Sequence, residues 1–200
     1  MYENVNVPDW IRNRNDLYSV YIFAREAHEF RTEDGKPQYR KFSNETLPYI
    51  THPLAVASIL FNRKVGDSNM WKAAILHDVV EDTLVELPEI RENFGDDIAY
   101  LVEGMTKKSM GSPELRAHRK AMDRDAYATY CERVQTVKVA DIMHNTYSAS
   151  TDGSYTWSIM WLNEALDLLG ALMLADSELR DRAISLVKTA IDLRMDIVKE

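Results

Sequence analysis

The sequence predicts an all-α protein built as one helical bundle, and three observations favour this class. The 200 residues include only seven glycines, β-branched residues seldom alternate with polar ones, and apolar residues recur every three or four positions over long stretches. With 46% hydrophobic residues, a chain of this length can bury a full core. No linker rich in Gly, Pro or Ser divides it, so we expect a single domain over residues 1–200.

Apolar periodicity and breaker residues give the expected elements in order. The first helix is expected over residues 17–30, and a polar loop without regular structure follows over 31–48, where Gly and Pro occur. Near the C-terminus one apolar stripe predicts a helix of about six turns, formed by Ile184, Val187, Ile191, Met195 and Val198. Between these, helices are expected over 52–63, 69–83, 96–106, 113–130, 133–148 and 155–174.

Composition excludes several functional classes. A formal net charge of -8 disfavours a nucleic-acid polymer as partner, because such binders carry broad basic faces. The apolar stretch 165–175 is too short to cross a bilayer, and the N-terminal residues lack a basic and then apolar signal pattern. Cys131 is the single cysteine, which excludes an intrachain disulfide and a thiolate zinc cluster. We therefore expect a cytoplasmic protein with no membrane partner.

The most informative residues are His77 and Asp78, which follow the apolar run 73–76. A buried ionised carboxylate needs a charged partner or a metal. His52 and Asp141 lie in similar apolar settings, although His52 alone could cap a helix and Asp141 alone could pair with an arginine or a helix N-terminus. One divalent transition ion with open coordination positions explains all four residues together. The sequence thus predicts a metal-dependent hydrolase.

Glu81 and Asp82 lie four residues after His77 and Asp78, so on one continuous helix each pair would share a face. A solvated acidic helix end is the simpler alternative, and the apolar residues that precede it disfavour that interpretation. Beside a metal, the two acids are candidates for orienting water and for donating a proton to a leaving oxygen.

Local cations could bind phosphate within this acidic chain. Arginine grips phosphate in bidentate fashion, whereas lysine acts as a point charge. Arg40 and Lys41 precede His52 by about a dozen residues and are the favoured candidates. For a later group, a solvated basic surface is the simpler interpretation; its members are Lys107, Lys108, Arg116 and Arg119.

Six ordered blocks within residues 24–146 resemble the HD superfamily, and within it the hydrolase domain of RelA/SpoT proteins and the small alarmone hydrolases. The blocks are Arg40-Lys41, Pro48-Tyr49-Ile50-Thr51-His52-Pro53, the run from Ile75 to Thr83, Phe94-Gly95, Glu103-Gly104-Met105-Thr106-Lys107, and Lys138-Val139-Ala140-Asp141 with Asn145. A bare His-Asp dipeptide is weakly specific, but six blocks in order are strongly specific. The residues after Asn145 match only in helical character.

The resemblance implies a role for each matching residue. His52, His77, Asp78 and Asp141 would bind one divalent ion, commonly manganese, while Glu81 and Asp82 would activate water and protonate the leaving group. Arg40 and Lys41 would hold the pyrophosphate and Asn145 would contact the nucleoside. The implied reaction is removal of the 3′-pyrophosphate from ppGpp or pppGpp, which yields GDP or GTP and pyrophosphate.

Two departures from the family pattern leave the substrate open. An insertion over residues 29–37 separates Ala27-His28 from Gln38, and the spacing from Arg40 to His52 is longer than usual. An alternative substrate is therefore another small-molecule nucleotide, such as a deoxynucleotide or NADPH losing its 2′-phosphate. A regulatory module that only binds nucleotide is a further alternative, but it would be expected to lack a ligand or the Glu81-Asp82 pair, and both are present.

Overall fold

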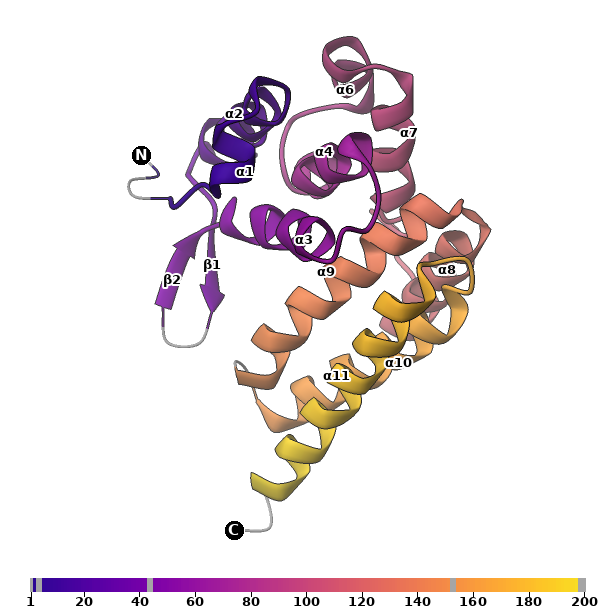
Figure 1. Cartoon of the computed structure of the whole chain (residues 1–200). Coiled ribbons are helices and arrows are strands. Elements are labelled where there is room, and N and C mark those ends of the chain that lie inside the picture. Colours follow the sequence, from indigo (N-terminus) through magenta and orange to yellow (C-terminus); the bar gives the residue numbers. More distant parts are fainter. Residues whose placement is uncertain (1, 3–4, 43–44, 152–153, 198–200) are drawn as a thin grey trace. The chain divides into compact units, whose positions relative to one another are not determined.

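The computed structural model describes residues 2, 5–42, 45–151 and 154–197. Apart from one two-stranded sheet, the regular elements in this part of the chain are helices, so the predicted all-α class is confirmed (Figure 1). The chain forms two compact units. The first comprises Met1–Arg40 and Thr46–Thr106, and the second comprises Lys41–Glu45 and Lys107–Glu200. Among the described residues, no helix combines the length and apolar character needed to cross a bilayer.

Helix α4 (Ser68–Leu76) is the buried centre of the first unit and contacts α2, α3 and α7. Its last four residues are completely buried, which places the following His77 in the interior. Asp67 caps the N-terminus of this helix, because its side chain accepts a hydrogen bond from the Met70 amide at 2.9 Å. Around it lie α1 (Asp9–Arg12), α2 (Asn15–Phe30), α3 (Thr51–Asn62), α5 (Val79–Asp82), α6 (Leu87–Phe94) and α7 (Asp96–Met105).

The continuous helix predicted over residues 69–83 is wrong at its most important position. Helix α4 ends at Leu76 and α5 begins only at Val79, with a turn at His77 and Asp78. Asp78 has φ -97° and ψ -5°, in the sparsely allowed region between the helical and extended basins. Successive residues of a regular helix point about 100° apart, so the turn lets these two neighbouring side chains converge.

The predicted structureless loop over 31–48 is also wrong in part. Strands β1 (Tyr39–Phe42) and β2 (Glu45–Pro48) pair in a two-stranded sheet. Four-residue strands show too few positions for an alternating pattern to be recognised. Two short helices, α1 and α6, were not expected either. Helix α6 ends at Phe94 and is followed by Gly95, whose φ of +88° is a conformation that glycine adopts without strain.

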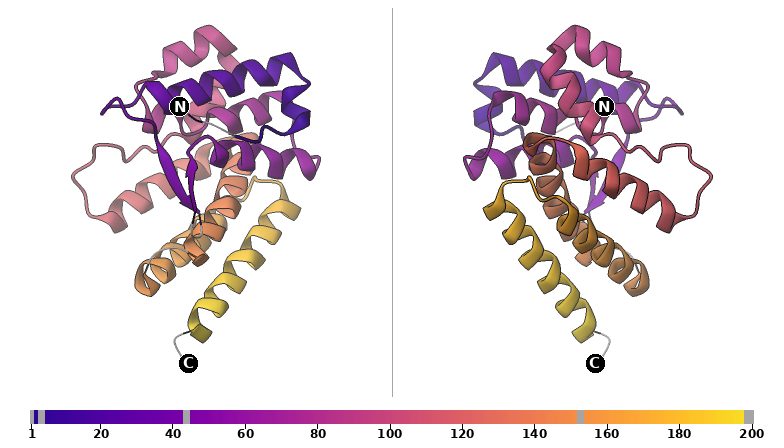
Figure 2. Two further views of the ribbon diagram at one scale, coloured as in Figure 1. Left: turned by 90° about the vertical axis from the view of Figure 1, so that its left-hand side faces the viewer. Right: turned by 90° about the vertical axis from the view of Figure 1, so that its right-hand side faces the viewer.

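Helix α9 (Glu132–Thr151) is the buried centre of the second unit, and every residue from Val134 to Met143 is buried. It contacts α8 (Arg116–Thr129), α10 (Tyr155–Ala171) and α11 (Ser177–Ile197), and α9, α10 and α11 run side by side in each view (Figures 1 and 2). The buried Gln135 amide donates to the Tyr130 carbonyl at 2.9 Å and accepts from the Leu174 amide at 2.9 Å. These bonds satisfy backbone groups at two interhelical turns.

The remaining predicted helices are confirmed with small shifts of their ends. Helices α2, α3 and α7 match the expected spans within two residues, whereas α8 begins three residues later and α10 ends three residues earlier than expected. Helix α11 begins before the apolar stripe that predicted it. Val198, the last residue of that stripe, lies outside the described residues.

Candidate metal centre

His77 is fixed in one tautomer by the end of α4. Its Nδ1 lies 2.8 Å from the main-chain oxygen of Ala74. Because that oxygen can only accept, Nδ1 carries a proton, and in the neutral ring Nε2 presents a lone pair. A hydrogen bond from the second ring nitrogen to a carbonyl is the arrangement that orients most metal-binding histidines. His77 is 1% exposed, so this lone pair is held in the interior.

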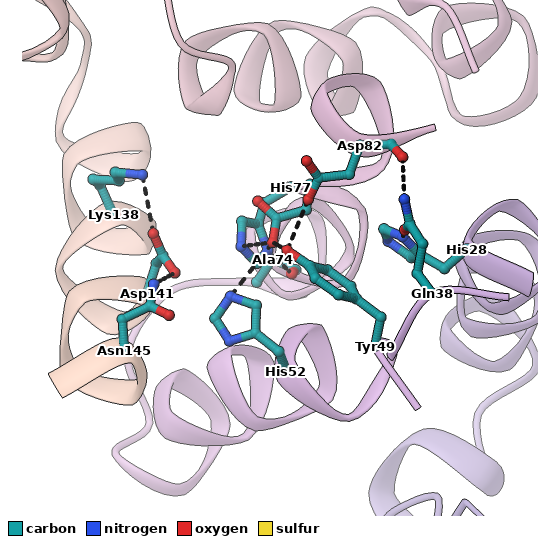
Figure 3. A network of polar contacts seen from close by, with 11 residues as sticks. His28, Gln38, Tyr49, His52, Ala74, His77, Asp82, Lys138, Asp141 and Asn145 are labelled. Carbon is teal, nitrogen blue, oxygen red and sulfur yellow. Dashed lines mark hydrogen bonds and ion pairs between the residues drawn. The ribbon is translucent and has the colours of Figure 1, made fainter. Parts of the chain in front are cut away.

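Asp78 forms a cluster with the buried residues His52 and His77, and the two histidines are labelled in Figure 3. The Oδ2 atom of Asp78 lies 3.1 Å from His77 Nε2 and 3.4 Å from His52 Nε2. One ligand atom from each residue lies within 4.8 Å of the others. His52 comes from the first turn of α3, where it is 1% exposed, whereas the Asp78 side chain retains 15% exposure.

This donor set fits a divalent transition ion. The lone pair of His77 Nε2 and an anionic oxygen of Asp78 face each other, so a cation or an added proton must lie between them to avoid repulsion. A proton on His77 would serve only one contact, whereas a divalent ion serves all three ligand atoms together. Two imidazoles and one carboxylate leave coordination positions open for water and substrate.

Tyr49 connects this cluster to Asp82. Its hydroxyl lies 2.8 Å from Asp78 Oδ2 and 2.8 Å from Asp82 Oδ2. Burial, followed by the charges of the two carboxylates, raises the pKa of Tyr49, so the hydroxyl keeps its proton at neutral pH. Asp82 ends the short helix α5, and Glu81 precedes it on the same helix with a half-buried side chain.

His28 and Gln38 support the other side of Tyr49. The rings of His28 and Tyr49 lie 4.6 Å apart at 33°. Gln38 Nε2 donates to the main-chain oxygen of Asp82 at 2.5 Å, which turns Gln38 Oε1 toward His28 Nδ1 at 2.7 Å. Burial lowers the pKa of His28 despite the hydrogen bond that His28 donates to Gln38, so the ring is neutral. That bond places the proton of the ring on Nδ1.

The insertion over residues 29–37 is accommodated as a closed loop. Gln38 returns to His28, because its amide donates to the His28 carbonyl at 2.9 Å. The loop is anchored by Arg31, which forms a two-pronged ion pair with Glu89 on α6 at 2.5 and 2.6 Å. The Leu84 amide also donates to the Arg31 carbonyl at 2.7 Å. The inserted residues therefore leave the pairing of His28 with Gln38 intact.

In the second unit, Asp141 and Asn145 form a hydrogen-bonded group with Lys138 on α9. Lys138 Nζ lies 2.9 Å from Asp141 Oδ2, and Asn145 Nδ2 donates to Asp141 Oδ1 at 2.6 Å. The Lys138 ammonium also lies 4.8 Å from the centre of the Tyr127 ring. Asp141 is 5% exposed, and its charge is therefore balanced locally within the second unit.

The basic residues are placed differently from one another. Arg40 and Lys41 are consecutive in β1, with Arg40 half-buried and Lys41 exposed, and consecutive strand residues point to opposite faces. Arg116 forms a two-pronged pair with Glu164 at 2.8 Å for each bond, and the Lys108 ammonium lies 5.5 Å from the Tyr130 ring. Arg119 donates to the Glu114 carbonyl.

The structure thus brings His52, His77 and Asp78 together, and it joins Asp82 to them through Tyr49. Sequence reasoning assigned no role to Tyr49, His28 or Lys138, although Tyr49 and Lys138 lie within recognised blocks. The signal for Tyr49 was its position three residues before His52, where the turn into α3 brings both side chains to one site; the His52 amide donates to the Tyr49 carbonyl at 2.9 Å.

Comparison with known proteins identifies the family of this chain. The HD domain family matches residues 21–146. A guanosine-3′,5′-bis(diphosphate) 3′-pyrophosphohydrolase of Xenopus tropicalis is 38% identical over 122 residues, which are 60% of this chain and 65% of that protein. The bifunctional (p)ppGpp synthase/hydrolase SpoT of Escherichia coli K12 is 38% identical over 138 residues, 64% of this chain and 17% of that protein. The chain thus spans slightly less than two thirds of the first relative and a small part of the second.

Two solved structures share the fold. A metazoan orthologue of SpoT superimposes with a TM-score of 0.71 at 20% identity, over 92% of this chain and 98% of that one. A Listeria monocytogenes protein superimposes with a TM-score of 0.56 at 26% identity, over 72% of this chain and 98% of that one. Since the family match covers more than half of the chain and includes all four candidate metal ligands, this protein belongs to the HD domain family.

Proposed function

We propose that this chain is a metal-dependent phosphohydrolase that removes the 3′-pyrophosphate of ppGpp or pppGpp, leaving GDP or GTP and pyrophosphate. The observation that carries the proposal is the cluster of His52, His77 and Asp78. The hydroxyl of one tyrosine, Tyr49, is hydrogen-bonded to both Asp78 and Asp82. Support for the substrate comes from relatives of 38% identity, which are described as hydrolases of this nucleotide.

For the metal, we propose one manganese ion held by His52, His77, Asp78 and Asp141. Asp141 is supported by its burial and by the family match, which extends to residue 146. Asn145 is hydrogen-bonded to Asp141, so besides contacting the nucleoside it would orient this ligand. When bound, a divalent ion neutralises phosphate charge and makes a coordinated water more acidic.

The acids of α5 would move the protons of the reaction. Glu81 would accept a proton from water as the water oxygen bonds to phosphorus. The bond between phosphorus and the nucleoside 3′-oxygen would break, and Asp82 would donate a proton to that oxygen. The contact of Asp82 with Tyr49 supports this assignment: one hydroxyl proton serves two carboxylates, so a proton on Asp82 would complete both hydrogen bonds.

Arg40 and Lys41 would supply the positive charge for the pyrophosphate. The chain as a whole carries a formal charge of -8, so attraction for a multiply charged substrate must be local. The closed loop over residues 29–37 supports this role, because it returns the chain to His28 just before these residues.

The test is a nucleotide panel with purified protein and manganese. Equal amounts of ppGpp, GTP, dATP and NADPH are incubated, and the phosphate products are identified. We expect pyrophosphate and GDP from ppGpp. The His77→Ala protein is the control for a contaminating hydrolase and should release neither. Turnover of dATP or NADPH without turnover of ppGpp would contradict the proposed substrate but remain consistent with the proposed metal site. Absence of turnover for every nucleotide would overturn the enzymatic assignment.

A further inference from the structure

The hydroxyl of Tyr49 occupies an unusual position between two carboxylates. It lies 2.8 Å from Asp78, a candidate metal ligand, and 2.8 Å from Asp82, the candidate proton donor (Figure 3). A phenol has one proton to donate, but its oxygen can also accept a bond from a protonated carboxyl. It can therefore bridge two acids that would otherwise repel and turn away from each other.

The ring of Tyr49 is held from behind. His28 lies against it at 4.6 Å, and His28 is completely buried, so the ring cannot swing in that direction. The Tyr49 amide donates to the main-chain oxygen of Gln38 at 3.1 Å. The side chain of Gln38 spans from His28 Nδ1 to the main-chain oxygen of Asp82. The same two residues thus fix the ring of Tyr49 and the backbone that carries Asp82.

The partners of the Gln38 side chain fix which of its atoms donates and which accepts. The main-chain oxygen of Asp82 only accepts, so the Gln38 atom facing it must be the amide nitrogen. Gln38 Oε1 must then accept from His28. Gln38 is therefore oriented by contacts on both sides, and a substitution that replaces its donor must weaken the hold on Asp82.

We propose that Tyr49 is a positioning residue that holds the carboxylates of Asp78 and Asp82 in one fixed arrangement, and that contacts from His28 and Gln38 support it. The inference rests on the proposed function, because it assigns Asp78 to the metal and Asp82 to proton transfer. It adds that metal binding and proton donation depend on the same hydroxyl.

The first experiment compares Tyr49→Phe with wild type. The substitution keeps the ring and its contact with His28 while removing the bridge. Partners beyond the ligands typically change metal affinity or activity by about 10- to 100-fold. We expect kcat to fall by about that factor, KM to change by less than about threefold, and manganese affinity to weaken roughly tenfold. Tyr18→Phe is the matched control: Tyr18 is exposed on α2, and its variant should behave as wild type.

A double-mutant cycle separates positioning from a general structural effect. If Tyr49 acts through Asp82, then Tyr49→Phe in the Asp82→Asn background should lower kcat by less than about twofold further. An equal fall in both backgrounds would overturn the link to Asp82, and an unchanged manganese affinity would overturn the link to Asp78. Either result defeats the proposal as stated.

Two further measurements keep the outcome decisive. If Tyr49→Phe fails to fold, Gln38→Glu tests the supporting contacts of Gln38 instead. This substitution keeps the shape of the side chain but places an acceptor against the Asp82 carbonyl. We expect kcat to fall by about three- to tenfold, and wild-type kcat would overturn the proposal. If the wild-type protein cleaves no nucleotide of the panel, the proposed function fails. The manganese affinity of Tyr49→Phe, measured without substrate, then decides whether Tyr49 positions Asp78.

Discussion

Asp141 is balanced within its own helix by two donors. Lys138 and Asn145 each donate to one of its oxygens, so the carboxyl group is oriented by two contacts in a buried helix. Asp141→Asn preserves the volume but removes the charge that a cation requires. We expect the variant to lose manganese, with affinity weakened at least about 100-fold, since ligand charge governs binding to a divalent ion. Elemental analysis after gel filtration measures this.

Asp123→Asn is the matched control for that variant. Asp123 is also a buried carboxylate of the second unit, but it accepts from the backbone and side chain of Ser109 at 2.9 and 2.8 Å. Its variant should retain manganese even if stability falls. Stoichiometric manganese in Asp141→Asn would remove Asp141 from the ligand set.

Glu81 allows the chemistry to be separated from the metal. Its half-buried side chain lies on α5, four residues after the candidate ligand His77. Glu81→Gln keeps the shape but cannot accept the proton from water. We expect manganese content and thermal stability to match wild type while kcat falls by roughly 100-fold or more. Hydrolysis of ppGpp at the wild-type rate would leave Asp82 as the sole acid–base group.

Arg40 and Lys41 can be distinguished because a strand points them in opposite directions. Arg40 is the half-buried member, so it is the better candidate for phosphate. We expect Arg40→Ala to lower kcat/KM for ppGpp by on the order of 100-fold, equivalent to about 2.7 kcal/mol. Arg40→Lys should recover little, because an ammonium lacks the two-pronged contact.

Lys41→Ala serves as the comparison, and we expect a smaller loss. Steady-state kinetics at physiological salt measures all three variants. Wild-type kcat/KM in both Arg40 variants would show that these side chains do not hold the substrate and would leave only the metal site supported.

The candidate ligands were predictable because each is a polar residue within an apolar run. Three of them converge as expected, at His52, His77 and Asp78. Tyr49 and Gln38 could not be assigned in the same way. Tyrosine and glutamine are ordinary in many settings, and their role here depends on a turn and a closed loop that only three-dimensional coordinates reveal.

At the scale of elements, the link between α2 and α4 gives a prediction for pH. Asp16 on α2 accepts from Lys72 and Ser68 of α4 at 3.0 and 3.1 Å. Burial alone would raise the pKa of Asp16, but the hydrogen bonds of Lys72, Arg14 and Ser68 outweigh it and lower the pKa from 3.8 to about 2. A carboxyl with a lowered folded-state pKa contributes stability above its ordinary pKa and loses it as pH falls through the folded-state value.

We therefore expect Asp16→Asn to lower the free energy of unfolding at pH 7 by less than about 1 kcal/mol, because the Asp16 side chain is 46% exposed and solvent screens the pair. The difference from wild type should shrink between about pH 4 and pH 2. Urea unfolding at several pH values measures it. A difference that is constant down to pH 2 would contradict a contribution from the ionised carboxyl.

Helices with a clear apolar stripe were predictable, whereas local interruptions were not. The turn at His77 and Asp78 divides a segment whose residues all favour a helix or tolerate one. The turn leaves the packing of α4 intact, because that helix is buried up to Leu76 and the turn comes only after it. The turn then directs the two polar side chains that follow to one site. The pairing of strands β1 and β2 depends on the packing of neighbouring residues, which a four-residue sequence pattern cannot specify.

At the scale of the whole molecule, each compact unit has one buried helix that presents polar residues. In the first unit α4 leads directly to His77 and Asp78, and in the second α9 carries Asp141. Buried carboxylates cost free energy unless they are paired or bind a metal. The ligand set is therefore expected to affect global stability and not only activity.

Removal of the metal is the test at this scale. A ligand that binds only the folded state stabilises it by RT ln(1 + [L]/Kd), about 2.7 kcal/mol when manganese is present at 100 times its Kd. For a chain of this size each kcal/mol shifts Tm by about 2–4 °C, so we expect saturating manganese to raise Tm by roughly 5–10 °C and a chelator to reverse the change. In Asp141→Asn the shift should be nearly absent, because the four proposed ligands act together. A wild-type Tm that does not respond to manganese would mean that the buried cluster of His52, His77 and Asp78 is balanced by protons and not by a metal.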